Sequence, residues 1–320
     1  MDKKQLDEVL ACFENERRIY RYFSDKYCVD ILSRWLGEGK SISEIKRSPL
    51  AGFLHRPWVK AHLAKLGSNR LTADTLALWW RDDEQHFQQT LAAWSDTYDW
   101  RWGQTSRRGY NLVLQLNFTQ SHNRDYDKWI KGSRFCVYDA SYHPVYQGEE
   151  RHTMAWARID MSDDLSEALI EEIQTDWLRD AERTLRHAKG ASNNRCSCLR
   201  CRENAKVTER QKQAFEHYHQ RHIAPMLGIW DEAMLNAALS FLFDDIGVER
   251  VFYHDFATGN ALKHIDCGKP PRSLYTQLPK RFGFVKTQEF PTFLPEKSLR
   301  KRLKKVQAPM FYVMKNLDNG

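Results

Sequence analysis

Hydrophobic residues recur at helical spacing over roughly the first 95 positions and at alternate positions after them. The spacing from Leu6 to Phe13 predicts a helix that continues through Ile19 to Phe23. The amphipathic stretch from Val29 to Leu36 predicts a second helix, which ends at Gly37.

Capping residues indicate more helices in the same region. Ser41-Ile-Ser-Glu44 has the form of a capping box, and Thr72 precedes a helix expected to carry the apolar residues from Leu76 to Trp94. We therefore expect residues 1–96 to form an all-α N-terminal domain, followed by a second domain over residues 97–320.

Basic residues accompany these short helices, at Lys46, Arg47, Arg56, Lys60 and Lys65. Short helices with such residues are typical of a helix-turn-helix that contacts DNA phosphates. They are equally typical of a helical scaffold with a solvated basic face. Both interpretations remain open.

Alternating patterns dominate the rest of the chain and predict an α+β fold. The expected strands are 110–118, 135–138, 152–160, 169–175, 251–254, 284–288 and 310–314. The expected helices are 125–130, 177–185, 231–243 and 273–281. Between them, a Cys-rich insertion is expected over about residues 186–224.

Composition and charge narrow the class of protein. The hydrophobic content of 42% is enough for a large core. The sequence has no run of about 18 consecutive apolar residues, so we do not expect a membrane span. The N-terminal residues do not resemble a secretion signal, so we expect a cytoplasmic protein. A formal charge of +7 favours an anionic partner.

Polar residues follow a buried strand in Glu172-Ile-Gln-Thr-Asp-Trp177. Glu172 or Asp176 is the candidate general base, since burial beside Trp177 would raise the pKa of a carboxyl towards neutrality. Gln174 could position a carbonyl or a base edge. The alternative is that Thr175 and Asp176 cap the following helix.

Three cysteines lie close together at Cys196, Cys198 and Cys201. Thiols at this density are typical of a zinc site, with His217, His219 or His222 as the fourth ligand. The alternatives are unligated thiols on a loop and an iron–sulfur cluster.

Basic runs suggest nucleic acid as a partner. Lys297–Lys305 holds six cations in nine residues, and Arg195, Arg200 and Arg202 surround the cysteines. Both groups could bind phosphates, although such runs are more often a solvated face. A protein partner is the alternative.

The order of a strand meander, helix, strand, helix and two closing strands resembles the GNAT acyltransferase fold. Ser273-Leu-Tyr-Thr-Gln-Leu-Pro-Lys-Arg-Phe-Gly-Phe284 is similar to the GNAT helix that ends in a Gly-Phe turn. The resemblance implies a GNAT-like mixed sheet flanked by helices. It also implies that Tyr275 can protonate a departing CoA thiolate.

The Glu172–Trp177 motif, the Trp230 helix start and Thr258-Gly259 look like a domain of polyvalent proteins of phages and mobile elements. That resemblance covers about residues 105–315. It implies a role in phage or mobile-element conflict, such as antiviral defence, and it makes Trp177, Thr258 and Gly259 the candidate cofactor-binding residues.

One departure from the GNAT pattern affects the expected donor. GNATs bind the CoA pyrophosphate through a glycine-rich loop at a helix N-terminus. The corresponding stretch, Met226–Glu232, has one glycine and two carboxylates. We therefore expect a transferase acting on nucleic acid or protein with a non-standard or absent acyl-CoA site. The rival is a non-catalytic binding module on a degenerate acyltransferase fold.

Overall fold

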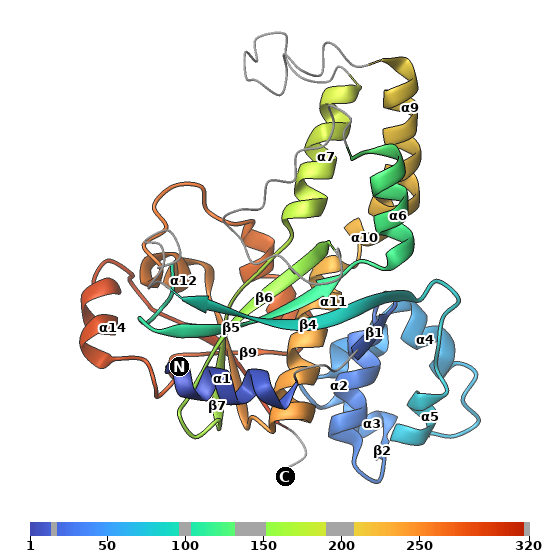
Figure 1. The fold of residues 1–320 in the computed structure, drawn as a ribbon. Helices are drawn as coiled ribbons and strands as arrows, with labels where there is room; N and C mark the ends of the chain where they lie inside the picture. Colours follow the sequence, from blue (N-terminus) through green and yellow to red (C-terminus); the bar gives the residue numbers. More distant parts are fainter. Residues whose placement is uncertain (14–17, 96–103, 132–151, 190–207, 317–320) are drawn as a thin grey trace.

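The computed structural model describes residues 1–13, 18–95, 104–131, 152–189 and 208–316. These residues form a mixed α+β structure in which helices flank one large sheet (Figure 1). The α+β prediction is therefore confirmed.

Within these ranges, the large sheet has eight strands in the order β1-β4-β5-β6-β7-β8-β10-β9. Their bounds are β1(Arg18–Tyr22), β4(Gln85–Ser95), β5(Tyr110–Asn117), β6(Thr153–Met161), β7(Glu167–Gln174), β8(Arg250–His254), β9(Val285–Thr287) and β10(Phe311–Lys315). All neighbours are antiparallel except β7 and β8, which pair in parallel from Glu167 opposite Arg250 to Ile170 opposite Tyr253. A second, two-stranded sheet joins β2(Lys40–Ser41) to β3(Arg70–Leu71).

The helices surround this sheet. They are α1(Lys3–Cys12), α2(Lys26–Leu36), α3(Ile42–Lys46), α4(Pro57–Leu63), α5(Ala73–Ala77), α6(Gln120–Trp129), α7(Asp176–Ala188), α9(Glu209–Tyr218), α10(Ala224–Leu227), α11(Trp230–Ser240), α12(Phe256–Leu262), α13(Leu278–Arg281) and α14(Glu296–Arg302). Short 3-10 helices cover η1(Ala51–His55) and η5(Arg272–Tyr275), and π-helical turns cover η3(His219–Ile223) and η4(Phe241–Ile246).

The core lies between the sheet and α11. Ala157 and Ile159 of β6 are fully buried, as is Leu235 of α11. Removing this apolar surface from water is the main stabilising contribution. Burial of α11 from Glu232 to Leu239 fits its position between the sheet and α2.

The expectation of an all-α N-terminal domain is wrong, because β1 and β4 belong to the large sheet. Residues 18–22 form a strand instead of the end of the first helix, and residues 85–95 form a strand instead of a long helix. Pairing of β4 with β5 from Gln88 to Ser95 overrides the weak helical pattern of that segment. The expected domain boundary between residues 96 and 97 lies outside the described residues.

Several other predicted elements are confirmed. Both hydrogen bonds of the Ser41–Glu44 capping box are present at the start of α3, and the Thr72 side chain caps α5. The strands β5, β6, β7, β8 and β10 occupy the expected segments, while the strand expected at 135–138 lies outside the described residues. The helix expected at 273–281 is divided into η5 and α13, with Pro279 near the start of α13.

Helices α6, α7 and α9 rise together on one side of the sheet (Figure 1). Aromatic and imidazole rings at the sheet-facing ends of these helices pack against one another beside the start of β6. We name this set the ring cluster: Phe118, His122, Tyr126, His152, Trp177, Tyr218 and His222.

Hydrogen bonds fix the centre of the ring cluster. Nε1 of Trp177 donates to the Tyr218 hydroxyl at 2.9 Å, and that hydroxyl lies 2.7 Å from Nε2 of His122. Nδ1 of His122 lies 3.0 Å from Oδ1 of Asn123. An amide oxygen only accepts, so Nδ1 carries the hydrogen, and the Tyr218 hydroxyl donates to Nε2 of a neutral His122.

Within the described ranges, no single helix is long and apolar enough to cross a membrane. One pair, Glu209–Leu227 with Trp230–Ile246, passes the length and composition test together but is bent by 53°.

Candidate functional site

The parallel strands β7 and β8 separate after Ile170 and Tyr253, and a cavity of about 580 Å³ lies beside the last residues of β7. Glu172 and Gln174 of β7 line it, together with Trp230 at the start of α11 and Tyr275 of η5. A volume of this size is ordinary for a small-molecule site.

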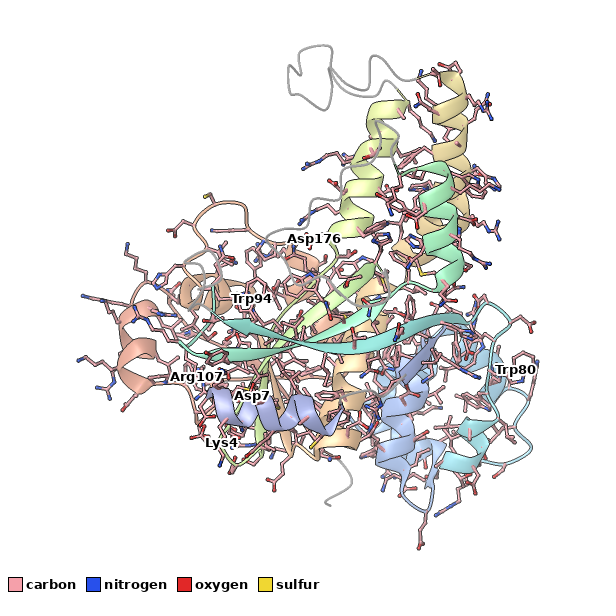
Figure 2. The ribbon with its side chains drawn as sticks, viewed as in Figure 1. Lys4, Asp7, Trp80, Trp94, Arg107 and Asp176 are labelled. Atoms are coloured by element: carbon pink, nitrogen blue, oxygen red, sulfur yellow. The ribbon has the colours of Figure 1, made fainter. Side chains whose placement is uncertain are left out.

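The cavity brings together three of the four predicted catalytic residues, Glu172, Gln174 and Tyr275. The fourth, Asp176, lies at the foot of α7 (Figure 2) and is not among the cavity-lining residues. Its carboxylate accepts hydrogen bonds from Nε1 of Trp156 at 3.2 Å and Nε2 of Gln174 at 2.7 Å.

The start of α7 is capped by Thr175 and not by Asp176. The Thr175 hydroxyl accepts from the backbone N–H of Leu178 at 3.3 Å and donates to the carbonyl of Met154 at 2.6 Å. Helix α7 begins at Asp176, whose negative charge is favourable at a helix N-terminus. The capping interpretation therefore applies to Thr175.

Glu172 is held between two buried cations. Its carboxylate oxygens lie 3.0 Å from Arg158 Nη2 and 3.3 Å from Lys263 Nζ. Burial alone would raise the pKa of Glu172, but the charges of Arg158 and Lys263 outweigh burial and lower it. The expected rise of this pKa beside Trp177 is therefore wrong. Trp177 belongs to the ring cluster, and Glu172 is ionised at neutral pH.

Tyr275 can donate a hydrogen bond, whereas the ionised Glu172 can only accept one. Its side chain is buried, and burial together with the nearby charge of Glu172 holds the pKa of the phenol well above its usual value. No hydrogen bond to this hydroxyl is found among the described residues. Lys263 Nζ lies 5.5 Å from the centre of the ring. Tyr275 is thus a protonated hydroxyl group at neutral pH, beside an ionised carboxylate.

Thr258 and Gly259 lie in α12 and do not line the cavity. The Thr258 hydroxyl accepts from the backbone N–H of Met310 at 3.0 Å. A Cβ on Gly259 would lie 2.9 Å from Cβ of His254. Both residues pack α12 closely against the neighbouring strands.

The space where β7 and β8 separate is filled by the chain's own residues 104–108, which we name the strap. The Ser106 backbone N–H donates to Glu171 at 2.8 Å, and the Ser106 hydroxyl lies 2.9 Å from Glu171 and 3.0 Å from Nε2 of His254. Ser106, Glu171 and His254 are all buried. Burial raises the pKa of Glu171, but the hydrogen bond and charge of His254 and the charges of Arg158 and Lys263 lower it to about 2.

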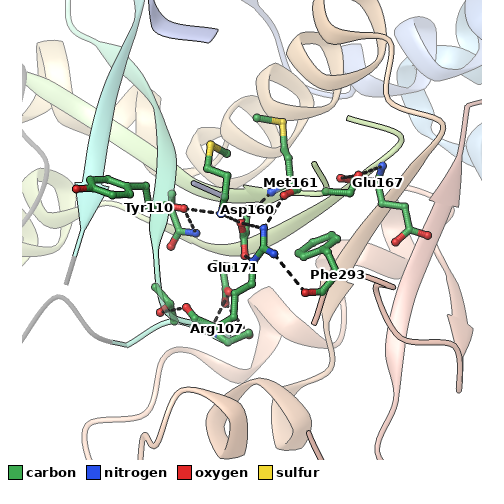
Figure 3. A network of polar contacts seen from close by, with 12 residues as sticks. Arg107, Tyr110, Asp160, Met161, Glu167, Glu171 and Phe293 are labelled. Carbon is green, nitrogen blue, oxygen red and sulfur yellow. Dashed lines mark hydrogen bonds and ion pairs between the residues drawn. The ribbon is translucent and has the colours of Figure 1, made fainter. Parts of the chain in front are cut away.

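Two arginines hold the strap from either side. Arg302 of α14 donates to the carbonyls of Thr105 at 3.0 Å and Ser106 at 3.1 Å. Arg107 of the strap pairs with Asp160 at 2.7 Å and donates to the carbonyl of Phe293 at 3.3 Å (Figure 3). Asp160 also accepts from the N-terminal ammonium group of Met1 at 2.5 Å.

Sequence reasoning missed Arg158, Lys263, Glu171 and Ser106. The one available signal was a cation inside an otherwise apolar strand, at Arg158. Such a residue is rarely buried without a charged partner, so it could have indicated a carboxylate on the next strand.

The prediction of a zinc site is corrected. Over the described ranges, no three or more His, Cys, Asp or Glu side chains are arranged to hold a metal ion. His217 packs against Trp129 with ring centres 5.0 Å apart, and His219 and His222 pair with Glu182 and Asp125. Cys196, Cys198 and Cys201 lie outside the described residues, as do Arg195, Arg200 and Arg202.

The two carboxylates of the Met226–Glu232 stretch are used inside the fold. Arg281 contacts Asp231 at 3.0 Å and Glu232 at 2.9 Å. Glu232 also accepts from the Tyr22 hydroxyl at 3.1 Å. Burial raises the pKa of Glu232 although Arg281 opposes that rise. These carboxylates therefore join α11 to α13 and β1.

Some cations of the Lys297–Lys305 run contact other residues of the chain, and others are exposed. Arg302 binds the strap, and Arg300 pairs with Glu296 at 2.5 Å. The exposed cations of the run include Lys301 and Lys304. Nucleic-acid binding by this run stays a prediction.

No family model, curated protein or solved structure matches this chain.

Proposed function

We propose that this chain transfers a group from an activated donor to a macromolecule, using the cavity beside β7 on a GNAT-like sheet. The observation that carries the proposal is the convergence of Glu172, Gln174 and Tyr275 on that cavity, from two parts of the chain about a hundred residues apart. The chain order of strands β4 to β7, helix α7, strand β8, helix α13 and the closing strands β9 and β10 supports the GNAT-like part, since it follows the element order on which the resemblance rests.

The two ionisable groups at the cavity have complementary roles. Glu172 is ionised and accepts a hydrogen bond from the amine or hydroxyl group that receives the transferred group. Tyr275 is protonated and gives its proton to the leaving group as the bond between donor and transferred group breaks. The acceptor forms its bond to the transferred group and loses its own proton to solvent, and solvent returns a proton to the Tyr275 phenolate. The weak basicity of Glu172 assigns it to orientation of the acceptor.

The donor is tested directly by two measurements on the purified protein. Native mass spectrometry reports any small molecule retained from the host. Incubation with radiolabelled acetyl-CoA or acetyl phosphate, with DNA, RNA or protein as acceptor, reports transfer. We expect Tyr275→Phe to lower the transfer rate by about 100-fold with an unchanged melting temperature, since loss of one general acid costs about that much. Equal rates in the two proteins would refute the role of Tyr275.

A non-catalytic binding module is the second candidate function. The ion pairs of Glu172 with Arg158 and Lys263 favour a binding module, because a carboxylate with a lowered pKa is a poor base. Ligand retention in native mass spectrometry without turnover of any tested donor would support this second candidate.

A further inference from the structure

The walls and the rim of the cavity beside β7 indicate which acceptor it takes. Trp230 lines the cavity and is partly buried against the core, and its ring makes no aromatic contact with another ring of the described residues. Pro270 and Pro271 add flat apolar surface. Flat walls of this kind suit a planar ring, because stacking against an indole stabilises every aromatic base.

Two of the residues that line the cavity offer a hydrogen-bond acceptor and a donor. Glu172 is 14% exposed and can only accept hydrogen bonds, whereas the Tyr275 hydroxyl can donate one. A nucleobase edge that carries an exocyclic amine next to a ring nitrogen or carbonyl presents the matching pattern. A protonated aliphatic amine presents only donors and leaves the hydroxyl without an acceptor.

Cations extend from the rim along α7. Lys269 and Arg179 line the cavity, and Arg183 and Arg186 follow Arg179 at positions that share one face of the helix. Arg179 is 60% exposed and also contacts Asp176, while Arg183 is 55% exposed. Exposed arginines at this spacing suit successive phosphates of a nucleic-acid strand.

We propose that the cavity beside β7 receives a single unpaired nucleobase carrying an exocyclic amine, with Trp230 stacked on the ring, Glu172 on the amine, and the flanking phosphates on Arg183 and Arg186. The inference deepens the proposed function by naming its acceptor. Because binding is measured without any donor, the result of the binding test does not depend on whether the chain transfers a group.

The first test is a titration of the intact protein with the four deoxynucleoside monophosphates, followed by tryptophan fluorescence and calorimetry. We expect the cytosine and adenine nucleotides to bind about tenfold or more tightly than analogues with a dimethylated exocyclic amine, which cannot donate to Glu172. Trp230→Ala is expected to weaken binding about 10- to 100-fold. Trp230→Phe, which keeps a stacking ring, is expected to give an intermediate loss and guards against misfolding of the alanine variant.

The second test uses the salt dependence of binding to a short single-stranded oligonucleotide. Replacing both Arg183 and Arg186 with Gln is expected to reduce the slope of log K against log salt by about 1.4, at roughly 0.7 per phosphate contact. The control replaces the exposed Lys3 and Lys4 of α1 with Gln and is expected to leave the slope unchanged.

Three results would overturn the proposal. They are the absence of saturable binding by any of the four nucleotides, equal binding of the dimethylated analogues, and equal slopes for the arginine and lysine variants. Binding of Nα-acetyl-lysine amide in place of the nucleotides would assign the cavity to a protein acceptor and reject the nucleobase, while leaving group transfer itself open to test.

Discussion

Mild acid should destabilise the protein through the ring cluster. Burial lowers the pKa of His152 to about 4 from its ordinary 6.5, although Asp127 opposes the shift. The unfolded chain therefore binds more protons than the native protein between these two values, and stability falls as the pH falls through that window. Stability from this group is fully present above pH 6.5. At pH 5 the loss is about 2 kcal/mol, an upper value because the ring is half-buried.

Two further rings add to the loss in the same direction. Burial lowers the pKa of His122 well below 6.5, and the neighbouring His222 and His152 lower it further. Burial also lowers the pKa of His222, against the hydrogen bond to Asp125. Each proton added to one imidazole disfavours a proton on the next, so the effect of acid is spread over several pH units.

Urea unfolding at pH 7.5 and pH 5, followed by circular dichroism, measures this loss. His152→Phe keeps an aromatic ring in the cluster and removes the titrating group. We expect the wild-type protein to lose up to about 2 kcal/mol more than the variant between the two pH values. If both proteins lose the same free energy of unfolding, His152 is not buried in its neutral form and the reasoning is refuted.

Two substitutions test the packing around the site. Arg281→Met leaves the buried Glu232 without its closest cation and should lower the free energy of unfolding by about 3 kcal/mol in urea; a loss below about 1 kcal/mol would show that Glu232 is neutral or otherwise paired. Gly259→Ala places a methyl group against His254 and should cost about 1–3 kcal/mol. In Gly67→Ala the methyl group meets no atom within 4 Å, so equal melting temperatures for these two alanine variants would argue against the close approach.

Sequence pattern located the strands of the second half because each keeps a strong apolar run. It failed from Gln85 to Ser95, where Phe87, Leu91 and Trp94 have helical spacing. In the strand, Phe87 and Leu91 face the main core and Trp94 faces the opposite side of the sheet. The conformation there is decided by pairing with β5, a contact that local sequence does not encode. The same holds for Arg18–Tyr22, which pairs with β4 among the described strands.

The candidate site was predicted only in part, because sequence pattern locates strand ends but not the contacts between distant segments. Glu172 and Gln174 follow a recognisable strand, and Tyr275 came from a resemblance. Lys263 could not be found, since its contacts with Glu172 join residues about ninety positions apart. The partner of a charge decides whether its pKa rises or falls, so the direction for Glu172 was also beyond sequence reasoning.

The strap gives the molecule a definite order of assembly. Ser106 contacts Glu171 and His254, and its carbonyl is held by Arg302 near the end of the chain. During synthesis, the early strands can pair while the later segments are still absent, because domains form from the N-terminal side. The junction between β7 and β8 is completed only once α14 has been made. This junction should therefore become rigid only after α14 has packed against the strap, and it should exchange its amide hydrogens when α14 detaches.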